Sequence, residues 1–308
     1  MTQKAKNQHF VPRGILKNFT FNKEKNKIYQ IDKTNGKLIQ SNLKGVAAEG
    51  YLYNYKNQKK SLEYDFFKEI DDVAAKIISK ILRDKTIRTL TKKENKNLIR
   101  FIASQICRVP LVLRSMKEIN DDLTKELGQK YSIIKEDHYT DFLNSIVEDT
   151  KLYENFLKNK ILTLIEVANE YFITSDNPVI KIAIDDNVEF ILGYVTPVIN
   201  RDIFMMPISS RFLLILTNED FQHDRKRLAL IHNNYQFIQA NKYIFSHSED
   251  ILKKEIKEYY EYAFRYIESI RPDFIQKYNI EFGQPLCIDI PRITFSENVK
   301  KEILSKQL

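Results

Sequence analysis

The spacing of apolar residues changes twice along this chain of 308 residues, and that change constrains the fold more than any other feature. Over 27–41, two short apolar runs flank Asn35-Gly36, a pair that favours the tight turn of a β-hairpin because both residues tolerate positive φ. Over 61–165, apolar residues recur every three or four positions, as in amphipathic helices. Over 166–308, short strand-like runs return between helical segments.

This order predicts an α+β fold. We expect an N-terminal β-hairpin segment, a central block of antiparallel helices, and a C-terminal mixed antiparallel sheet with helices. The corresponding parts are a basic arm and hairpin over 1–60, the helical block over 61–165 and an α+β part over 166–308, packed as one compact unit. Within the helical block, Thr91 followed by Glu94 predicts a capping box at the start of a helix.

Several common classes of functional site are excluded by the sequence. Only 7 of the 308 residues are glycine, and no two of them form G-x-G or G-x-x-x-x-G-K, which excludes a dinucleotide fingerprint and a P-loop. The two cysteines, Cys107 and Cys287, form no C-x-x-C pair, which excludes a cysteine-rich zinc site. The sequence also lacks H-E-x-x-H and G-x-S-x-G.

The first ten residues, MTQKAKNQHF, lack the apolar stretch of a secretory signal. The apolar runs elsewhere are too short to span a bilayer. We therefore expect a cytoplasmic protein with no membrane partner and no disulfide framework.

Positive charge is concentrated in the first 60 residues. This segment holds 13 Lys or Arg and 3 Asp or Glu, a net charge of +10, against +8 for the whole chain. A localised basic surface attracts polyanions by counterion release, so we expect nucleic acid as a partner. The candidate contact residues are Lys4, Lys6, Arg13 and Lys17. The alternative is an ordinary solvated surface, because the whole sequence is rich in lysine.

Residues 8–13 read Q-H-F-V-P-R and form the first candidate site. Pro12 fixes its own φ and pushes Val11 toward extended geometry. In an extended run alternate side chains share a side, so we expect His9 and Arg13 to lie together. Imidazole acts as a general acid or base near neutral pH, and a guanidinium stabilises charge that develops on a phosphoryl group. The alternative is a basic arm in which His9 only caps a nearby group.

Residues 174–178 read T-S-D-N-P and follow an apolar run, 171–174, that we expect to form a strand. Asp176 and Asn177 would then lie at the C-terminal end of that strand, where a rigidly held carboxylate could bind a metal or orient a histidine. The alternative is a plain turn closed by an Asx hydrogen bond.

Arg108 lies between Cys107 and Val109, in a largely apolar stretch of an expected helix. A buried arginine usually needs a carboxylate partner, so Arg108 is either part of a core salt bridge or an anion clamp in a site. Glu63 and Asp71 lie on the preceding expected helix, about 80° apart around its axis, and could edge one groove. Alternatively, they are ordinary carboxylates near a helix start, where the dipole favours them.

Together these motifs resemble the bacterial family known as domain of unknown function 4238. The resemblance rests on Q-H-F-V-P at 8–12, S-L-E at 61–63, R-x-P at 108–110 and S-D-N-P-V at 175–179, which occur in the family's order over roughly residues 7 to 250. It implies that His9, Arg108, Asp176 and Asn177 belong to family motifs. The family often has a glutamate a few residues beyond S-L-E, and the nearest match here is Asp71.

We expect a nuclease, or another phosphodiester-acting effector of a bacterial defence or toxin type. In this hypothesis Asp176 orients His9 as the general base, and arginines neutralise the phosphoryl oxygens. The candidate catalytic residues are His9, Arg13, Arg108, Asp176 and Asn177. A metal-dependent form would use His9, Glu63 and Asp176 as ligands of Mg²⁺ or Mn²⁺. The alternative is a non-catalytic binding or sensor protein in which the same residues form a structural polar network.

Overall fold

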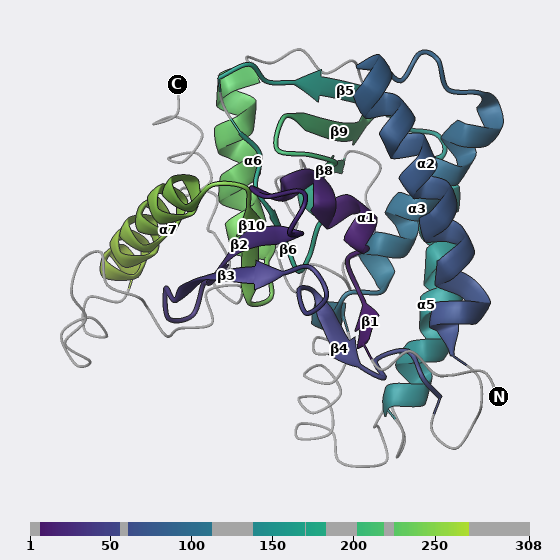
Figure 1. Ribbon diagram of the computed structural model, residues 1–308, viewed down its shortest axis with the longest axis horizontal. Helices are drawn as coiled ribbons and strands as arrows, with labels where there is room; N and C mark the ends of the chain where they lie inside the picture. Colours follow the sequence, from purple (N-terminus) through teal and green to yellow (C-terminus); the bar gives the residue numbers. More distant parts are fainter. Residues whose placement is uncertain are drawn as a thin grey trace.

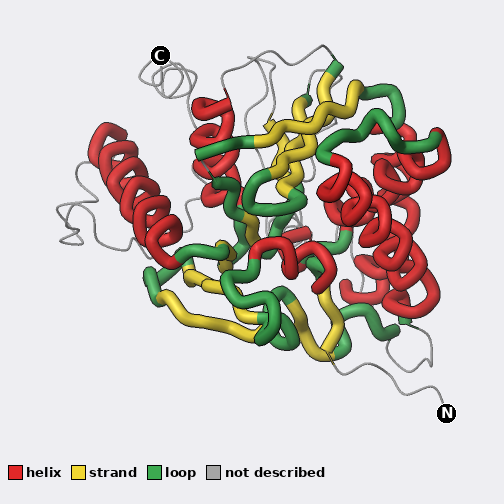
Figure 2. Tube along the Cα trace, turned by 45° about the horizontal axis from the view of Figure 1, so that its top comes forward, coloured by secondary structure: helices red, strands yellow, loops and turns green. Residues whose placement is uncertain are grey.

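The computed structural model describes residues 7–55, 61–112, 138–169, 171–182, 202–218 and 225–270. Within these ranges the fold is α+β, with helices from the middle of the chain beside three antiparallel sheets (Figure 1). The strands lie between this helical block and the last two helices (Figure 2). The predicted fold class is confirmed. None of the helices in these ranges is long and apolar enough to cross a bilayer.

The helical block begins with η2 (Glu63–Phe67), a π-helical turn that leads directly into α2 (Lys68–Asp84). It continues with α3 (Lys92–Cys107) and α5 (His138–Leu157). Most of the apolar positions that predicted these helices are buried, and α3 packs against both α2 and α5, whereas Leu152 on α5 is exposed. The helical period is therefore confirmed for these helices, but the predicted helical block ends too late, because Ile161–Glu166 is a strand.

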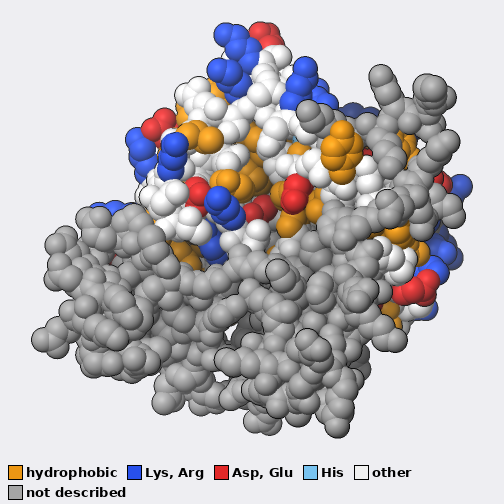
Figure 3. All heavy atoms as spheres, turned by 90° about the horizontal axis from the view of Figure 1, so that it is seen from below, with side chains coloured by type: hydrophobic (Ala, Val, Ile, Leu, Met, Phe, Trp, Pro, Cys, Tyr) orange, Lys and Arg blue, Asp and Glu red, His pale blue; other side chains and the backbone are white. Residues whose placement is uncertain are grey.

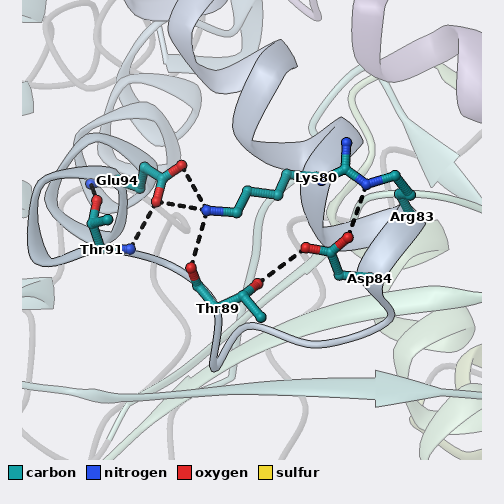
Figure 4. A network of polar contacts seen from close by, with 6 residues as sticks. All are labelled: Lys80, Arg83, Asp84, Thr89, Thr91 and Glu94. Atoms are coloured by element: carbon teal, nitrogen blue, oxygen red, sulfur yellow. Dashed lines mark hydrogen bonds and ion pairs between the residues drawn. The ribbon is translucent and has the colours of Figure 1, made fainter.

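A polar network closes the turn between α2 and α3 (Figure 4). Thr91 Oγ1 accepts from the backbone N–H of Glu94, and the Glu94 carboxylate accepts from the backbone N–H of Thr91, which confirms the predicted capping box. Lys80 donates to both Glu94 oxygens, at 2.9 and 3.0 Å, and to the carbonyl oxygen of Thr89. These contacts fix the angle at which the two helices meet.

The expected N-terminal hairpin consists of β2 (Lys27–Asp32) and β3 (Leu38–Asn42). Gly36 in its turn has a φ of 70°, which glycine adopts without strain. The hairpin is part of a larger sheet, because β2 also pairs with β10 (Tyr243–Ser246), which pairs with β6 (Thr174–Ser175). The strand order is β3-β2-β10-β6. The sheet thus joins the first part of the chain to the last.

A second sheet has the order β5-β9-β8-β7 and is antiparallel throughout. Its strands are β5 (Ile161–Glu166), β7 (Ile180–Ile182), β8 (Ile203–Pro207) and β9 (Phe212–Thr217). The central strand β9 is buried along its whole length. This agrees with its uninterrupted apolar sequence, since a strand covered on both faces does not alternate.

Two helices complete this part of the chain, α6 (Arg225–Gln239) and α7 (Glu249–Ile270). They pack against each other, and α7 also contacts β2 and β10. The predicted strand over 171–174 is wrong in extent, because only its last residue belongs to β6. The backbone N–H of Ile173 donates to the side chain of Asn233 in α6 instead of to a neighbouring strand.

The smallest sheet pairs β1 (Asn7–His9) with β4 (Ala48–Gly50), and two short helices follow β1, α1 (Arg13–Leu16) and η1 (Lys17–Phe19). A single apolar cluster joins the three predicted parts of the chain. It buries, for example, Phe19, Phe101 and Phe204 together. The short elements at the N-terminus are therefore held by the same core as the helical block.

Candidate functional site

Arg108 follows α3 and has no exposed surface. Its terminal nitrogens donate to the two carboxylate oxygens of Asp71, at 2.9 and 3.1 Å, and its Nε donates to the carbonyl oxygen of Phe10 at 3.0 Å. The guanidinium carbon lies 4.7 Å from the centre of the Phe67 ring. With its amide oxygen turned toward the guanidinium, Gln105 accepts a further hydrogen bond. Of the two predicted roles of Arg108, the structure shows the core salt bridge.

Gln8 ties the first motif to the other two. Its Nε2 donates to Asn54 Oδ1 and to Ser61 Oγ, both at 3.0 Å, and its Oε1 accepts from the backbone N–H of Tyr53 at 2.6 Å. The Tyr53 hydroxyl in turn donates to the carbonyl oxygen of Arg108 at 2.7 Å. The Q-H-F-V-P, S-L-E and R-x-P motifs thus form one buried polar network.

His9 bonds the backbone at Val46. Its Nδ1 lies 3.0 Å from the carbonyl oxygen of Val46. Because a carbonyl oxygen can only accept, Nδ1 carries the ring proton and Nε2 keeps its lone pair. Burial lowers the pKa of His9 to about 4, the Val46 hydrogen bond opposes this fall, and the charges of Arg13 and Arg108 add to it. The imidazole is therefore neutral at pH 7, and Nε2 bonds no residue in the ranges described.

Arg13 is exposed and close enough to His9 for its charge to lower the pKa of the imidazole. The reason for this proximity differs from the prediction. The extended run ends at Pro12, with φ −59° and ψ 137°, and Arg13 is the first residue of α1. Val11, which was expected on the same side as His9, is fully buried. The helix turn, and not strand alternation, places the guanidinium near the ring.

Glu63 is the other titratable group near this network. Its Oε2 is buried and has no hydrogen-bond partner among the described residues. Burial raises the pKa of Glu63 to about 6; Arg108 opposes the rise and Asp71 adds to it. Glu63 and His9 thus both sense the charge of Arg108, and burial shifts each toward its uncharged form.

Asp176 bonds backbone groups between α6 and β10. It is 2% exposed, and its oxygens accept from the backbone N–H groups of Asn241, Lys242 and Tyr243, at 2.8, 2.7 and 2.9 Å. Burial raises the pKa of Asp176, and the three N–H groups and the charge of Lys33 act against that rise. The carboxylate thus fixes the connection between α6 and β10.

Asn177 belongs to the same connection. Its Nδ2 donates to the carbonyl oxygen of Gln239 at 2.9 Å, and its own carbonyl oxygen accepts from Gln236 Nε2 and Ser175 Oγ. Ser175, Asp176 and Asn177 are all buried. The S-D-N-P segment is therefore a structural joint between β6 and the end of α6, in line with the alternative interpretation of a turn.

His9 and Asp176 do not form the predicted pair. His9 bonds the backbone at Val46, before β4, whereas both Asp176 oxygens bond the backbone at the start of β10. The prediction that Asp176 orients the imidazole is wrong, because the Val46 carbonyl performs that task. His9 and Arg13 are brought together, with Glu63 and Arg108 electrostatically coupled to the same network.

The predicted metal ligands are not gathered either. Across the ranges that the structure describes, no three His, Cys, Asp or Glu side chains are grouped so that they could hold a metal ion. The set of His9, Glu63 and Asp176 therefore does not fit Mg²⁺ or Mn²⁺. Of the predicted nucleic-acid contacts, Lys17 is exposed on η1, and Lys4 and Lys6 lie outside the described residues.

Two residues that hold the S-D-N-P joint were not predicted from the sequence. Lys33, at the end of β2, is buried and donates to the carbonyl oxygens of Phe237 and Ala240 at the end of α6. Gln239 bonds both backbone groups of Lys181, as a neighbouring strand would. No local sequence pattern identifies Lys33 or Gln239, because the groups that they bond are far away in the sequence.

The family model described as Protein of unknown function (DUF4238) matches residues 7–250. The chain belongs to this family. The match includes every motif of the Arg108 network and of the S-D-N-P joint, so the predicted resemblance is confirmed. In this chain the DUF4238 motifs are chiefly parts of the fold, and among the described residues His9 Nε2 and Glu63 Oε2 are motif atoms without a hydrogen-bond partner. No curated protein and no solved structure matches the chain.

Proposed function

We propose that this member of the DUF4238 family is a phosphodiester-acting hydrolase, a nuclease, in which His9 is the general base and Arg13 holds a phosphate. One observation carries the proposal: the Val46 carbonyl fixes the His9 ring by Nδ1, which leaves Nε2 as a proton acceptor on a ring that senses the charge of the exposed Arg13. This is the orientation that a general base requires.

The low pKa of His9 is compatible with this role. A base with a pKa of about 4 is weak in the free protein. A phosphodiester bound by Arg13 would place a negative charge next to the ring and would offset the two arginines, so the pKa of His9 would rise toward the operating pH. Glu63, whose pKa is raised to about 6, is the candidate for the general acid, because the fraction of molecules in which its carboxyl is protonated can donate that proton to the leaving group.

Arg108 and Asp71 act as positioning residues in this proposal. Arg108 holds the carbonyl of Phe10, the residue directly after His9, and Asp71 neutralises the guanidinium. Substrate would bind by charge at the N-terminal arm. The coloured part of the face in Figure 3 carries Lys and Arg side chains interspersed with acidic and apolar ones. We expect binding to depend on Arg13 and Lys17, the exposed cations that follow His9.

The activity test uses the full chain with RNA and DNA oligonucleotides, in EDTA and in Mn²⁺. We expect His9→Gln to lower the cleavage rate by about 10²- to 10⁴-fold, which is the usual effect of removing a general base. Arg13→Gln should raise KM, whereas Arg88→Gln, at an exposed arginine in the α2–α3 turn, is the matched control. Equal cleavage by wild type and His9→Gln, or none by either, removes His9 from the chemistry.

A second candidate function is a non-catalytic binding or sensor protein. The observation that favours it is the closure of the network: Gln8 and Arg108 are fully buried, and hydrogen bonds to neighbouring residues occupy their side-chain groups. Absence of cleavage together with saturable binding of an oligonucleotide would support this function. For either function we expect a cytoplasmic protein of a bacterial defence or toxin type, on the basis of the sequence motifs.

A further inference from the structure

Three segments that the proposed function does not use meet at the ring of Tyr171. The guanidinium carbon of Arg211, in the β8–β9 turn, lies 5.7 Å from the centre of this ring. The ring centre of His247, in the turn between β10 and α7, lies 4.7 Å from it. Tyr171 itself is 36% exposed, and its carbonyl oxygen accepts from Asn233 Nδ2 at 3.0 Å. An aromatic ring, a guanidinium and an imidazole thus share one partly open position.

Arg211 is held rigidly at the base of its side chain. Its backbone N–H donates to Ser209 Oγ, its carbonyl oxygen accepts from the N–H of Val167, and its Nε donates to the carbonyl oxygen of Val167 at 2.6 Å. The terminal guanidinium nitrogens bond no residue in the part of the chain that the structure describes. The positive end of the side chain is therefore preorganised and has donors to spare.

His247 offers a donor next to this guanidinium. Its Nδ1 is buried without a partner among the described residues, so a proton there would have no acceptor. The neutral ring therefore keeps its proton on Nε2, which makes Nε2 a donor. Burial lowers the pKa of His247, and the charge of Arg211 lowers it further. Without a ligand, the charge of Arg211 thus disfavours protonation of the imidazole.

We propose that Tyr171, Arg211 and His247 form a binding site for the phosphate group of a small phosphorylated ligand. Both polar groups are donors, so they suit an acceptor, and an anion would relieve the repulsion between Arg211 and a protonated His247. A phosphate monoester carries about −1.5 to −2 charges at pH 7, which matches one guanidinium and one imidazolium better than a carboxylate does. The site shares no residue with the His9 site and does not depend on the proposed nuclease activity.

The experiment is a calorimetric titration of the full chain with inorganic phosphate, adenosine monophosphate and acetate in separate runs. We expect one saturable site for at least one of the two phosphate compounds and weaker binding of acetate. Tighter binding of adenosine monophosphate identifies an organic monoester as the ligand, and tighter binding of inorganic phosphate identifies the free ion. In either case the His247 ring signals, followed by NMR, should titrate at a higher pH when the ligand is bound.

Three variants locate the site. Arg211→Gln should weaken phosphate binding by about tenfold or more, the effect of losing a charge-assisted hydrogen bond. His247→Gln should also weaken binding, and it breaks no hydrogen bond within the described ranges, so it remains informative if Arg211→Gln fails to fold. Arg88→Gln is the exposed control and should bind as wild type does. No saturable binding, equal binding of acetate and phosphate, or binding unchanged by both Arg211→Gln and His247→Gln would overturn the proposal.

Discussion

Burial decides which residues of the N-terminal network can carry charge. Arg108 is fully buried and keeps its charge because Asp71 meets it in a bidentate pair. His9 and Glu63 have no such partner, and burial moves their pKa values in opposite directions, to about 4 and about 6. Between these values both groups are uncharged. Around neutral pH the carboxyl is ionised and the imidazole is a free base.

Glu63 should make the folded protein less stable as the pH rises from 4.5 to about 6. The folded state binds the proton more tightly than the unfolded chain, where the pKa is near 4.5, so stability is highest below 4.5 and falls until about 6. The fall amounts to about 1–2 kcal/mol. Urea unfolding of wild type and Glu63→Gln at several pH values measures it, because the difference between the two proteins isolates this carboxyl.

His9 acts in the opposite direction, since its folded pKa lies below its unfolded one and its contribution rises as the pH increases from about 4 to 6.5. It is present in both proteins of the comparison and cancels. A difference in stability between wild type and Glu63→Gln that stays constant from pH 4.5 to 7 would show that Glu63 titrates normally.

For single residues, the sequence predicts that a side chain requires a partner more readily than it predicts which group supplies that partner. That Arg108 requires a carboxylate follows from its apolar neighbours, and Asp71 supplies it. That Asp176 would serve three backbone N–H groups could not be predicted, because those groups lie more than 60 residues away and carry no side-chain signal.

At the scale of elements, the connection between α6 and β10 is held from both sides by opposite charges. Asp176 accepts from the N–H groups that begin β10, and Lys33 donates to the carbonyl groups that end α6. A helix end and a strand start each leave backbone groups without partners, and these two side chains satisfy them. The connection contains no glycine, and these two side chains fix its conformation.

Asp176→Asn should destabilise the protein by about 2–4 kcal/mol, because an amide has one acceptor oxygen for three N–H donors and no longer offsets the positive charge of Lys33. Urea unfolding measures the change. Asp72→Asn, at an exposed position on α2, is the control and should stay within about 0.5 kcal/mol of wild type. If Asp176→Asn abolishes cleavage but leaves the unfolding midpoint unchanged, Asp176 serves the chemistry and not the joint.

Helices were predicted more completely than strands, and the reason is physical. A helix such as α2 forms its hydrogen bonds within itself, so its apolar period is a local signal. Residues 171–173 have the composition of a strand, yet Phe172 and Ile173 donate their N–H groups to Ser210 and Asn233. Composition does not reveal which acceptor a distant segment will provide.

For the whole molecule, the main consequence of the topology is that the N-terminal hairpin and the C-terminal part share a sheet. Ile31 in β2 lies opposite Ile244 in β10, and β2 is the strand between β3 and β10. The fold class followed from the order of periods in the sequence. This pairing did not, because any two strands of similar composition could have become neighbours.

The fragment 61–308 should therefore not fold alone. Without the first 60 residues, β10 loses its neighbour β2, Arg108 loses the Phe10 carbonyl, and the cluster around Phe19 is opened. We expect the fragment to lack a cooperative thermal transition, and the full chain to unfold in a single one, as measured by calorimetry. A fragment that melts cooperatively at the temperature of the full chain would mean that the hairpin is an appendage.

The bidentate contact between Arg108 and Asp71 also limits which substitutions this protein can accept during evolution. A neutral residue at either position leaves the other charge in the interior without its ion-pair partner, which costs about 3–5 kcal/mol and is a large share of the stability of an ordinary domain. Phe10 contributes only a backbone oxygen to the guanidinium, so its side chain is free of that restriction. Positions 71 and 108 can therefore lose their charges only together, because each single loss leaves an unpaired charge behind.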